Sequence, residues 1–226
     1  ITKNDPEAQN IAKRFTGTIS FITGLSGPRA TIAIKDARVA FMPWKIHHPD
    51  IVLFFVNERV LNKVFAGKAP AFPLPIKGIT RISGLIVLMK LLKQMENTLQ
   101  KNEGNKDLKA QSMLHIMARA MEIMANHEKE SRAIADHMEG ITEFTIKGLD
   151  AAHVDFTGQK ASYCAGKASH PDLILEFSSS DVFLGVTDDR VDVMAAICQE
   201  DMSLKGNLHM GQSVNIFLDK IGSYLQ

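Results

Sequence analysis

The sequence repeats itself, and this repeat constrains the fold more than any other feature. Residues 48–53 (HPDIVL) are echoed by residues 170–175 (HPDLIL), and residues 76–78 (IKG) correspond further along to residues 204–206 (LKG). The same order of matches pairs residues 31–34 with 153–156, Phe41 with Tyr163, Lys45 with Lys167, and Phe55 with Phe177. One short match would be chance, but a colinear series indicates two copies of one structural unit.

Each copy shows the same order of strand and helix signals. Apolar runs predict five strands per copy, at 15–23, 30–34, 38–42, 51–56 and 75–83, and at 141–147, 152–157, 160–164, 173–177 and 202–210. Helical spacing and capping residues predict helices at 5–14, 58–65, 85–99, 108–138 (broken near Asn126) and 213–225. In the second copy, Ser180-Asp181 could cap a helix that corresponds to 58–65, and a further segment follows at 188–197. These signals divide the chain into a first repeat (1–100), a polar linker (101–107), and a linking helix with the second repeat (108–226).

The fourth strand of each copy shows which side faces the core. Leu173, Leu175 and Phe177 alternate with Asp172 and Glu176, so the apolar set points inward. In the first copy the outward positions are also apolar, because Phe54 stands where the second copy has Glu176 and Val52 accompanies it. A strand that is apolar on both faces is typical of one covered on both sides. We therefore expect this outer face to meet the other copy or a second chain.

Composition excludes several classes of protein. The 26 basic and 25 acidic residues nearly balance and are scattered, which argues against a nucleic-acid partner. The longest apolar-rich stretch, 84–92, is interrupted by Lys90 and is too short for a transmembrane segment. Cys164 and Cys198 have no CxxC or metal-ligand spacing, which predicts reduced thiols in the cytoplasm. Because the sequence begins at Ile1 instead of Met, the question whether an N-terminal segment was removed stays open.

No catalytic or metal-binding constellation stands out. His47 and His48 would point to opposite sides of an extended segment, and no third ligand accompanies them. We expect neither cysteine to have a nearby histidine, and there is no GxSxG nucleophile motif. Asp188, Asp189 and Asp192 lack the order of a calcium-binding loop. We therefore expect no enzyme activity, no cofactor and no metal.

The order of elements and two short motifs resemble the sterol carrier protein type-2 (non-specific lipid-transfer) family as a tandem duplication. A Pro-Asp pair opens the fourth strand at residues 49–51 and 171–173, and a short helix follows. A Lys-Gly strand comes next, at Lys77-Gly78 and Lys205-Gly206, before an apolar closing helix. The resemblance covers about 15–99 and 141–225. It implies an α+β fold of two repeats, each a five-stranded, mostly antiparallel sheet with helices packed on one face.

The resemblance also implies an apolar tunnel in each repeat that binds lipid, sterol or fatty-acyl ligands. Its lining would come from inward residues of the fourth strand and the last helix. These residues are Ile51, Leu53, Phe55, Leu85, Met89 and Leu92 in the first copy, and Leu173, Leu175, Phe177, Val214, Phe217 and Ile221 in the second. Met113, Met117, Met121 and Met124 form a further stripe on the linking helix, which suits ordinary core packing or a ligand surface.

Two functions of different classes follow. The first is a soluble cytoplasmic protein that binds and transfers a lipid-like or fatty-acyl ligand without catalysis. The alternative is a non-catalytic module for homodimerisation or for docking to a lipid- or acyl-metabolising enzyme, which Val52, Phe54 and Trp44 favour. A tunnel of several hundred Å³ would support the carrier, and an interior filled with side chains would support the module.

Overall fold

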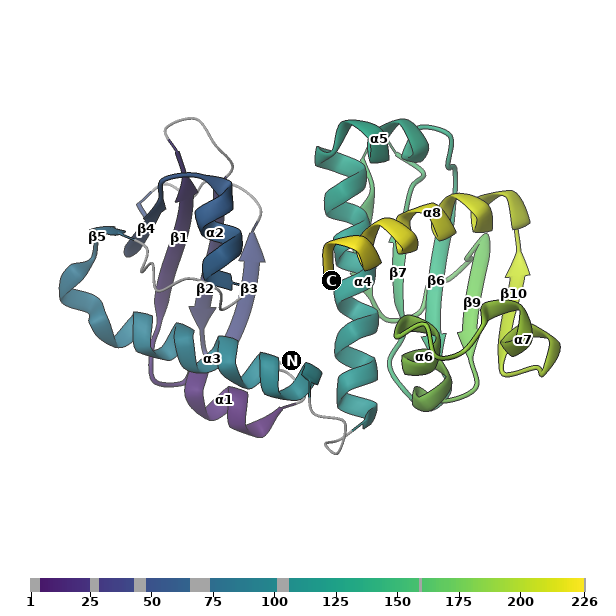
Figure 1. Cartoon of the computed structure of the whole chain (residues 1–226), viewed down its shortest axis with the longest axis horizontal. Helices are drawn as coiled ribbons and strands as arrows, with labels where there is room; N and C mark the ends of the chain where they lie inside the picture. Colours follow the sequence, from purple (N-terminus) through teal and green to yellow (C-terminus); the bar gives the residue numbers. More distant parts are fainter. Residues whose placement is uncertain are drawn as a thin grey trace. The chain divides into compact units, whose positions relative to one another are not determined.

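The computed structural model describes residues 5–24, 29–42, 48–65, 74–100, 106–158 and 160–225. The chain divides into two compact units, Ile1–Gln100 and Lys101–Gln226 (Figure 1). The predicted linker lies mostly outside the described residues, and its last two positions, Lys106 and Asp107, already belong to a helix. Trp44, Lys45 and His47 also lie outside them.

The second unit is a five-stranded sheet with helices across one face. Its strands stand in the order β10-β9-β6-β7-β8, and β6 pairs with β9 in parallel while the other pairs are antiparallel. Helix α8 runs across the strands, and α4 lies along the strand direction against β7 and β8 (Figure 1). The elements are α4 (Lys106–His127), α5 (Lys129–Ala135), β6 (Ile141–Ile146), β7 (Ala152–Asp155), β8 (Ser162–Ala165), β9 (Leu173–Phe177), α6 (Ser180–Thr187), α7 (Val193–Cys198), β10 (Met202–Gly206) and α8 (Leu208–Leu225).

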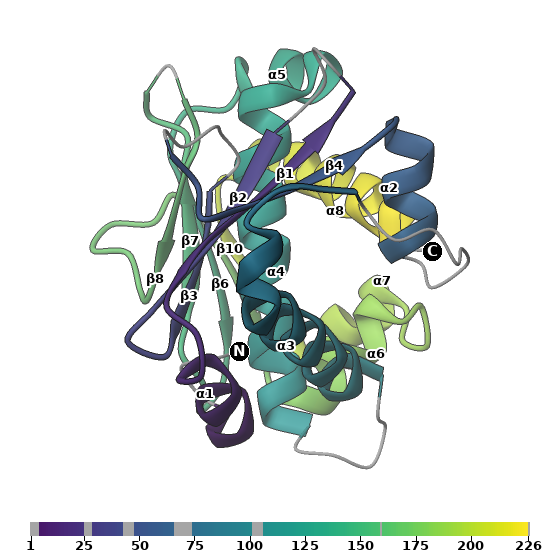
Figure 2. The same ribbon diagram turned by 90° about the vertical axis from the view of Figure 1, so that its left-hand side faces the viewer.

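The first unit has the same topology. Its strand order is β3-β2-β1-β4-β5, and β1 pairs with β4 in parallel, as β6 does with β9. Helix α1 packs beside α3 (Figure 2). The elements are α1 (Pro6–Ala12), β1 (Gly17–Thr23), β2 (Arg29–Lys35), β3 (Arg38–Met42), β4 (Ile51–Phe55), α2 (Glu58–Phe65), β5 (Leu74–Lys77), η1 (Ile79–Arg81) and α3 (Ile82–Gln100). The predicted fold class, two α+β units with mostly antiparallel sheets, is confirmed.

The repeated Pro-Asp motif fixes the start of the parallel strand pair in both units. The carboxylate of Asp50 accepts hydrogen bonds from the backbone N–H of Thr18 at 2.8 Å and from its hydroxyl at 3.0 Å. Burial raises the pKa of Asp50, but the hydrogen bonds from Thr18 and the charges of Arg81 and Lys77 outweigh it and leave that pKa lowered. Asp172 accepts the same bond from the N–H of Ile141 at 2.8 Å. The motif is therefore structural in each copy.

The repeated Lys-Gly motif meets the Pro-Asp motif at close range. Gly78 and Gly206 have φ values of +80° and +108°, a region that favours glycine. A Cβ atom at Gly78 would lie 2.4 Å from the carbonyl oxygen of Asp50, and one at Gly206 would lie 2.0 Å from that of Asp172. Glycine is thus required at both positions because another backbone passes against it.

Local capping moves several helix boundaries away from the predicted ones. The side chain of Asn207 accepts bonds from the N–H groups of His209 and Met210, so α8 begins at Leu208 and the preceding strand ends at Gly206. Ser179, the residue before the predicted capping pair, caps α6 through the N–H of Val182. The predicted break near Asn126 is confirmed, because α4 ends at His127 and Glu128 is extended.

Side chains on the outer face of the first sheet have limited exposure to solvent. Val52 is 8% exposed and Phe54 is half-buried, while the hydroxyls of Ser20 and Thr31 bond each other at 2.8 Å. That another copy or a second chain covers this face stays a prediction.

Candidate functional site

The predicted tunnel residues of the first unit lie mostly in its core. Ile51, Leu53 and Phe55 are buried, and Leu85 and Leu92 pack partly buried against the same cluster. Met89 departs from the expectation, because 56% of it is exposed.

In the second unit the predicted tunnel residues form one continuous core. Leu173, Leu175 and Phe177 of β9 are buried, and they belong to the same cluster as three residues of α8. Those are Val214, Phe217 and Ile221. Side chains therefore fill the space between this strand and helix, and whether a ligand can replace them stays a prediction.

The methionine stripe of α4 faces this core. Met121 and Met124 are buried in the cluster, and Met113 and Met117 pack against it partly buried. The structure therefore supports the core-packing interpretation, with flexible side chains bordering the interior.

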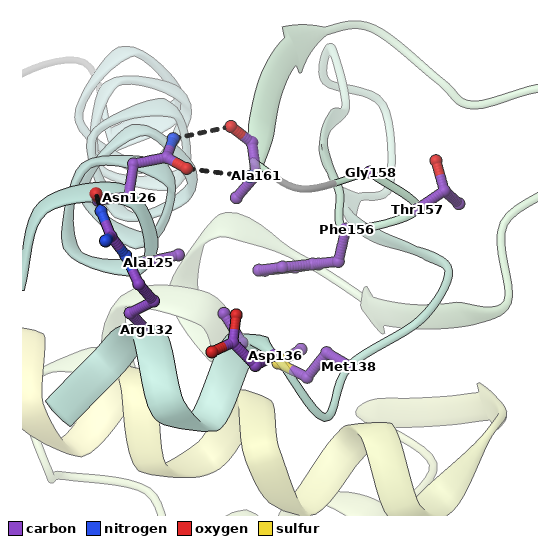
Figure 3. Close-up of a pocket in the computed structure, with 10 residues that line it drawn as sticks. Ala125, Asn126, Arg132, Asp136, Met138, Phe156, Thr157, Gly158 and Ala161 are labelled. Atoms are coloured by element: carbon purple, nitrogen blue, oxygen red, sulfur yellow. Dashed lines mark hydrogen bonds between the residues drawn. The ribbon is translucent and has the colours of Figure 1, made fainter. Parts of the chain in front are cut away.

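A cavity of about 450 Å³ opens at one end of the second unit. The end of α4, helix α5 and the connection from β7 to β8 surround it (Figure 3). Its lining combines apolar, aromatic, polar and charged groups: Ala125, Asn126, Arg132, Ala135, Asp136, Met138, Phe156, Thr157, Gly158 and Ala161. The predicted tunnel residues are not among them.

Two contacts define the walls of this cavity. The side chain of Asn126 donates to the carbonyl oxygen of Ala161 at 2.8 Å and accepts from its N–H at 3.0 Å, which holds the strand connection against α4 (Figure 3). The buried ring of Phe156 lies 6.3 Å from that of Phe217, centroid to centroid. One aromatic ring thus separates the cavity from a predicted tunnel residue. No periodic pattern in the sequence indicates this site, because its residues come from the ends of helices and strands and from their connections.

A polar cluster ties α8 to the corner between α4 and α5. The carboxylate of Glu128 accepts bonds from Ser131 Oγ at 2.5 Å, Lys220 Nζ at 2.9 Å and Tyr224 Oη at 2.7 Å. Bonds from Lys220 and Ser131, chiefly, lower the pKa of Glu128 to about 2. Lys220 also contacts Glu130 at 3.0 Å. The cluster fixes α8 beside the helices that line the cavity.

The remaining polar candidates have structural contacts. Asp188 pairs with Arg190 at 3.0 Å, and Asp192 caps α7. The sheet register places His153 directly opposite Cys164, so the expectation that no histidine lies near that cysteine was wrong. His153, however, donates from Nδ1 to the carbonyl oxygen of Gly166 at 2.8 Å.

The part of the chain that the structure describes offers neither a metal-ion site nor a membrane-spanning helix. No group of three or more His, Cys, Asp or Glu residues there is placed to hold a metal ion. None of the helices described is both long and apolar enough to span a bilayer.

The fold and its apolar interior define a class of small α+β domains in which helices cover one face of a five-stranded sheet. Residues 121–219 match the model of the SCP-2 sterol transfer family. This match covers most of the second unit, and the strands of the first unit stand in the same order as those of the second. Comparison with curated proteins finds no match.

Several solved structures are similar to part of the chain. The solution structure of sterol carrier protein domain 2 of Helicoverpa armigera is 13% identical, covering 54% of this chain and 93% of that one, with a TM-score of 0.39. Apo sterol carrier protein 2 from Yarrowia lipolytica is 14% identical, covering 54% and 94%, also with a TM-score of 0.39. The ubiquinone synthesis protein UbiJ-SCP2 is 15% identical, covering 50% and 88%, with a TM-score of 0.35.

Proposed function

We propose that the second unit binds and transfers a lipid-like or fatty-acyl ligand without catalysing a reaction. The observation that carries the proposal is a cavity of about 450 Å³ in the unit that matches the SCP-2 family model, beside an apolar core. Its volume falls within the usual range for small-molecule sites. The ligand would enter beside Phe156 and displace core side chains such as Phe217. Burial of each methylene contributes about 0.8 kcal/mol without directional contacts, so an acyl chain needs no polar partner along its length.

Two matched tryptophan variants test this proposal. Ala135 lines the cavity, whereas Ala133 lies exposed on the same helix, α5. Ala135→Trp would fill the cavity and is expected to reduce retention of co-purified or added palmitate at least tenfold in native mass spectrometry. Ala133→Trp adds the same side chain to the same helix and should bind like the wild type. Equal binding by both variants, or a wild type without ligand after incubation with palmitate, palmitoyl-CoA and cholesterol, would refute the proposal.

The filled core between β9 and α8 favours the second function, an assembly module. In that case both units would present surfaces to a second copy or to an enzyme partner, and the wild type would stay free of ligand. Light scattering after size-exclusion chromatography would then show a stable dimer across the micromolar range.

A cytoplasmic location is part of the proposal. Cys164 and Cys198 are both exposed and unpaired, which suits a reducing compartment. We also infer that the two units are duplicates of one domain, supported by their common strand order and by the repeated contacts of Asp50 and Asp172.

A further inference from the structure

Among the described residues of the second unit, one buried polar side chain has no hydrogen-bond partner. Thr142 on β6 is fully buried, and among the residues that the structure describes only its Oγ1 is a buried side-chain polar atom without a hydrogen bond. The residue points to the helix-covered side of the sheet, because it pairs with Leu173 on one side and Val154 on the other, both in the core. A buried hydroxyl without a partner is rare and costly in a folded protein.

The first unit shows that the fold does not need this hydroxyl. Ile19 pairs in parallel with Ile51, just as Thr142 pairs with Leu173, and Ile51 and Leu173 are matched positions of the repeat. Ile19 is fully buried in the core of its own unit. An apolar side chain thus serves the same position in the sister sheet, so packing alone gives no reason for threonine.

Thr142 does not line the cavity but lies close to Phe156, which does. Val154, its cross-strand partner, is two residues from Phe156, whose N–H donates to the carbonyl oxygen of Gly140 at 2.9 Å. Phe156 therefore lies on the same face of the sheet as Val154 and closer to the cavity. Across the strand pair it is a diagonal neighbour of Thr142. In Figure 3 the Phe156 ring extends from its strand towards α4. Movement of this ring would connect the cavity with the hydroxyl.

We propose that Thr142 is the internal polar contact of the binding site and hydrogen-bonds an uncharged oxygen, a hydroxyl or carbonyl, of an otherwise apolar ligand. A neutral oxygen can exchange a bond to water for one to Oγ1. An ionised carboxylate would lose its solvation without a counter-charge, since the surrounding core cluster is apolar. This inference rests on the proposed function and deepens it, because it assigns a preference for neutral alcohols or esters over fatty-acid anions.

The test compares substitutions at two threonines of the same strand. Thr142→Val removes the hydroxyl at nearly constant shape, and Thr142→Ser retains it. Thr145→Val makes the same change three residues along, on the opposite face of the sheet. Binding would be measured at pH 7.5 by displacement of a fluorescent fatty-acid probe with 1-hexadecanol, hexadecane and palmitate.

We expect Thr142→Val to weaken 1-hexadecanol binding about three- to tenfold and to leave hexadecane binding unchanged. Thr142→Ser should keep the preference for the alcohol, and Thr145→Val should resemble the wild type. The melting temperature of ligand-free Thr142→Val should also rise by about 2–4 °C, because the unpartnered hydroxyl is gone.

Two results would overturn the inference and are distinguishable. If the wild type binds these ligands and Thr142→Val retains the full preference for the alcohol, the assignment of Thr142 is wrong while the proposed function stands. If the wild type binds none of the probes, the proposed function fails and this inference fails with it.

Discussion

Besides its apolar packing, α8 is held to the corner between α4 and α5 by the carboxylate of Glu128, and Glu128→Gln tests this contribution. Glu128 accepts three side-chain hydrogen bonds, one of them from the cationic Lys220. Before solvent screening is taken into account, lowering the pKa of Glu128 from 4.5 to about 2 corresponds to roughly 3 kcal/mol of stabilisation of the folded state. The side chain is 30% exposed, so solvent screens much of this energy. We expect Glu128→Gln to destabilise the packing of α8 by ~1–2 kcal/mol at pH 7.

Hydrogen exchange of the α8 amides measures this effect locally, which matters because the two units need not unfold together. The expected loss corresponds to roughly 5- to 30-fold faster exchange. Glu130→Gln is the matched control, since Glu130 contacts the same lysine but is 83% exposed. It should change exchange by no more than about twofold. Similar effects from both substitutions, or none from Glu128→Gln, would refute the reasoning.

The pH dependence has a defined sign. The pKa of Glu128 is lowered in the folded state, so its stabilisation is fully present above the ordinary value of 4.5 and is lost as pH falls towards about 2. Protection of α8, corrected for intrinsic exchange rates, should therefore decline over this window in the wild type. In Glu128→Gln the same window should show a much smaller decline.

Two further substitutions test the fold and the packing behind the cavity. In chemical denaturation, Gly206→Ala should destabilise the second unit by more than ~3 kcal/mol, because its Cβ would lie 2.0 Å from the Asp172 carbonyl oxygen. Gly148→Ala is the control: its Cβ would meet no atom within 4 Å, so the substitution should destabilise by only about 1 kcal/mol because of the positive φ. Phe217→Ala removes the ring that packs on Phe156 and should lower the stability of the second unit by about 3–5 kcal/mol. The enlarged space should increase uptake of a fluorescent fatty-acid probe. Unchanged uptake would show that this ring does not border the site.

The repeat predicted the fold because both copies obey the same pattern. Alternation in the fourth strand identified the inward residues, and the buried positions of Leu173, Leu175 and Phe177 agree with it. Boundaries that depend on a single capping side chain, such as the start of α8 after Asn207, were several residues off. Met89 shows a further limit, since helical spacing alone did not fix how far the apolar face of α3 extends.

The cavity could not be predicted from the same pattern, for a physical reason. Periodicity identifies side chains that point inward, and such side chains fill a core, as Phe217 and Ile221 do. A cavity forms where elements end and diverge, so its walls come from α5 and from the connection of β7 to β8.

Comparison between the copies carries information that periodicity does not. Aligning β1 with β6 sets Ile19 against Thr142, an apolar residue against a hydroxyl at one core position. An exchange of this kind puts a smaller side chain with a buried hydroxyl where the other copy has an apolar one, so it loses apolar packing and lowers stability. In a duplicated fold, one copy can carry a destabilising polar residue at a core position that is apolar in the other copy. We expect the first copy to contact its ligand at that position.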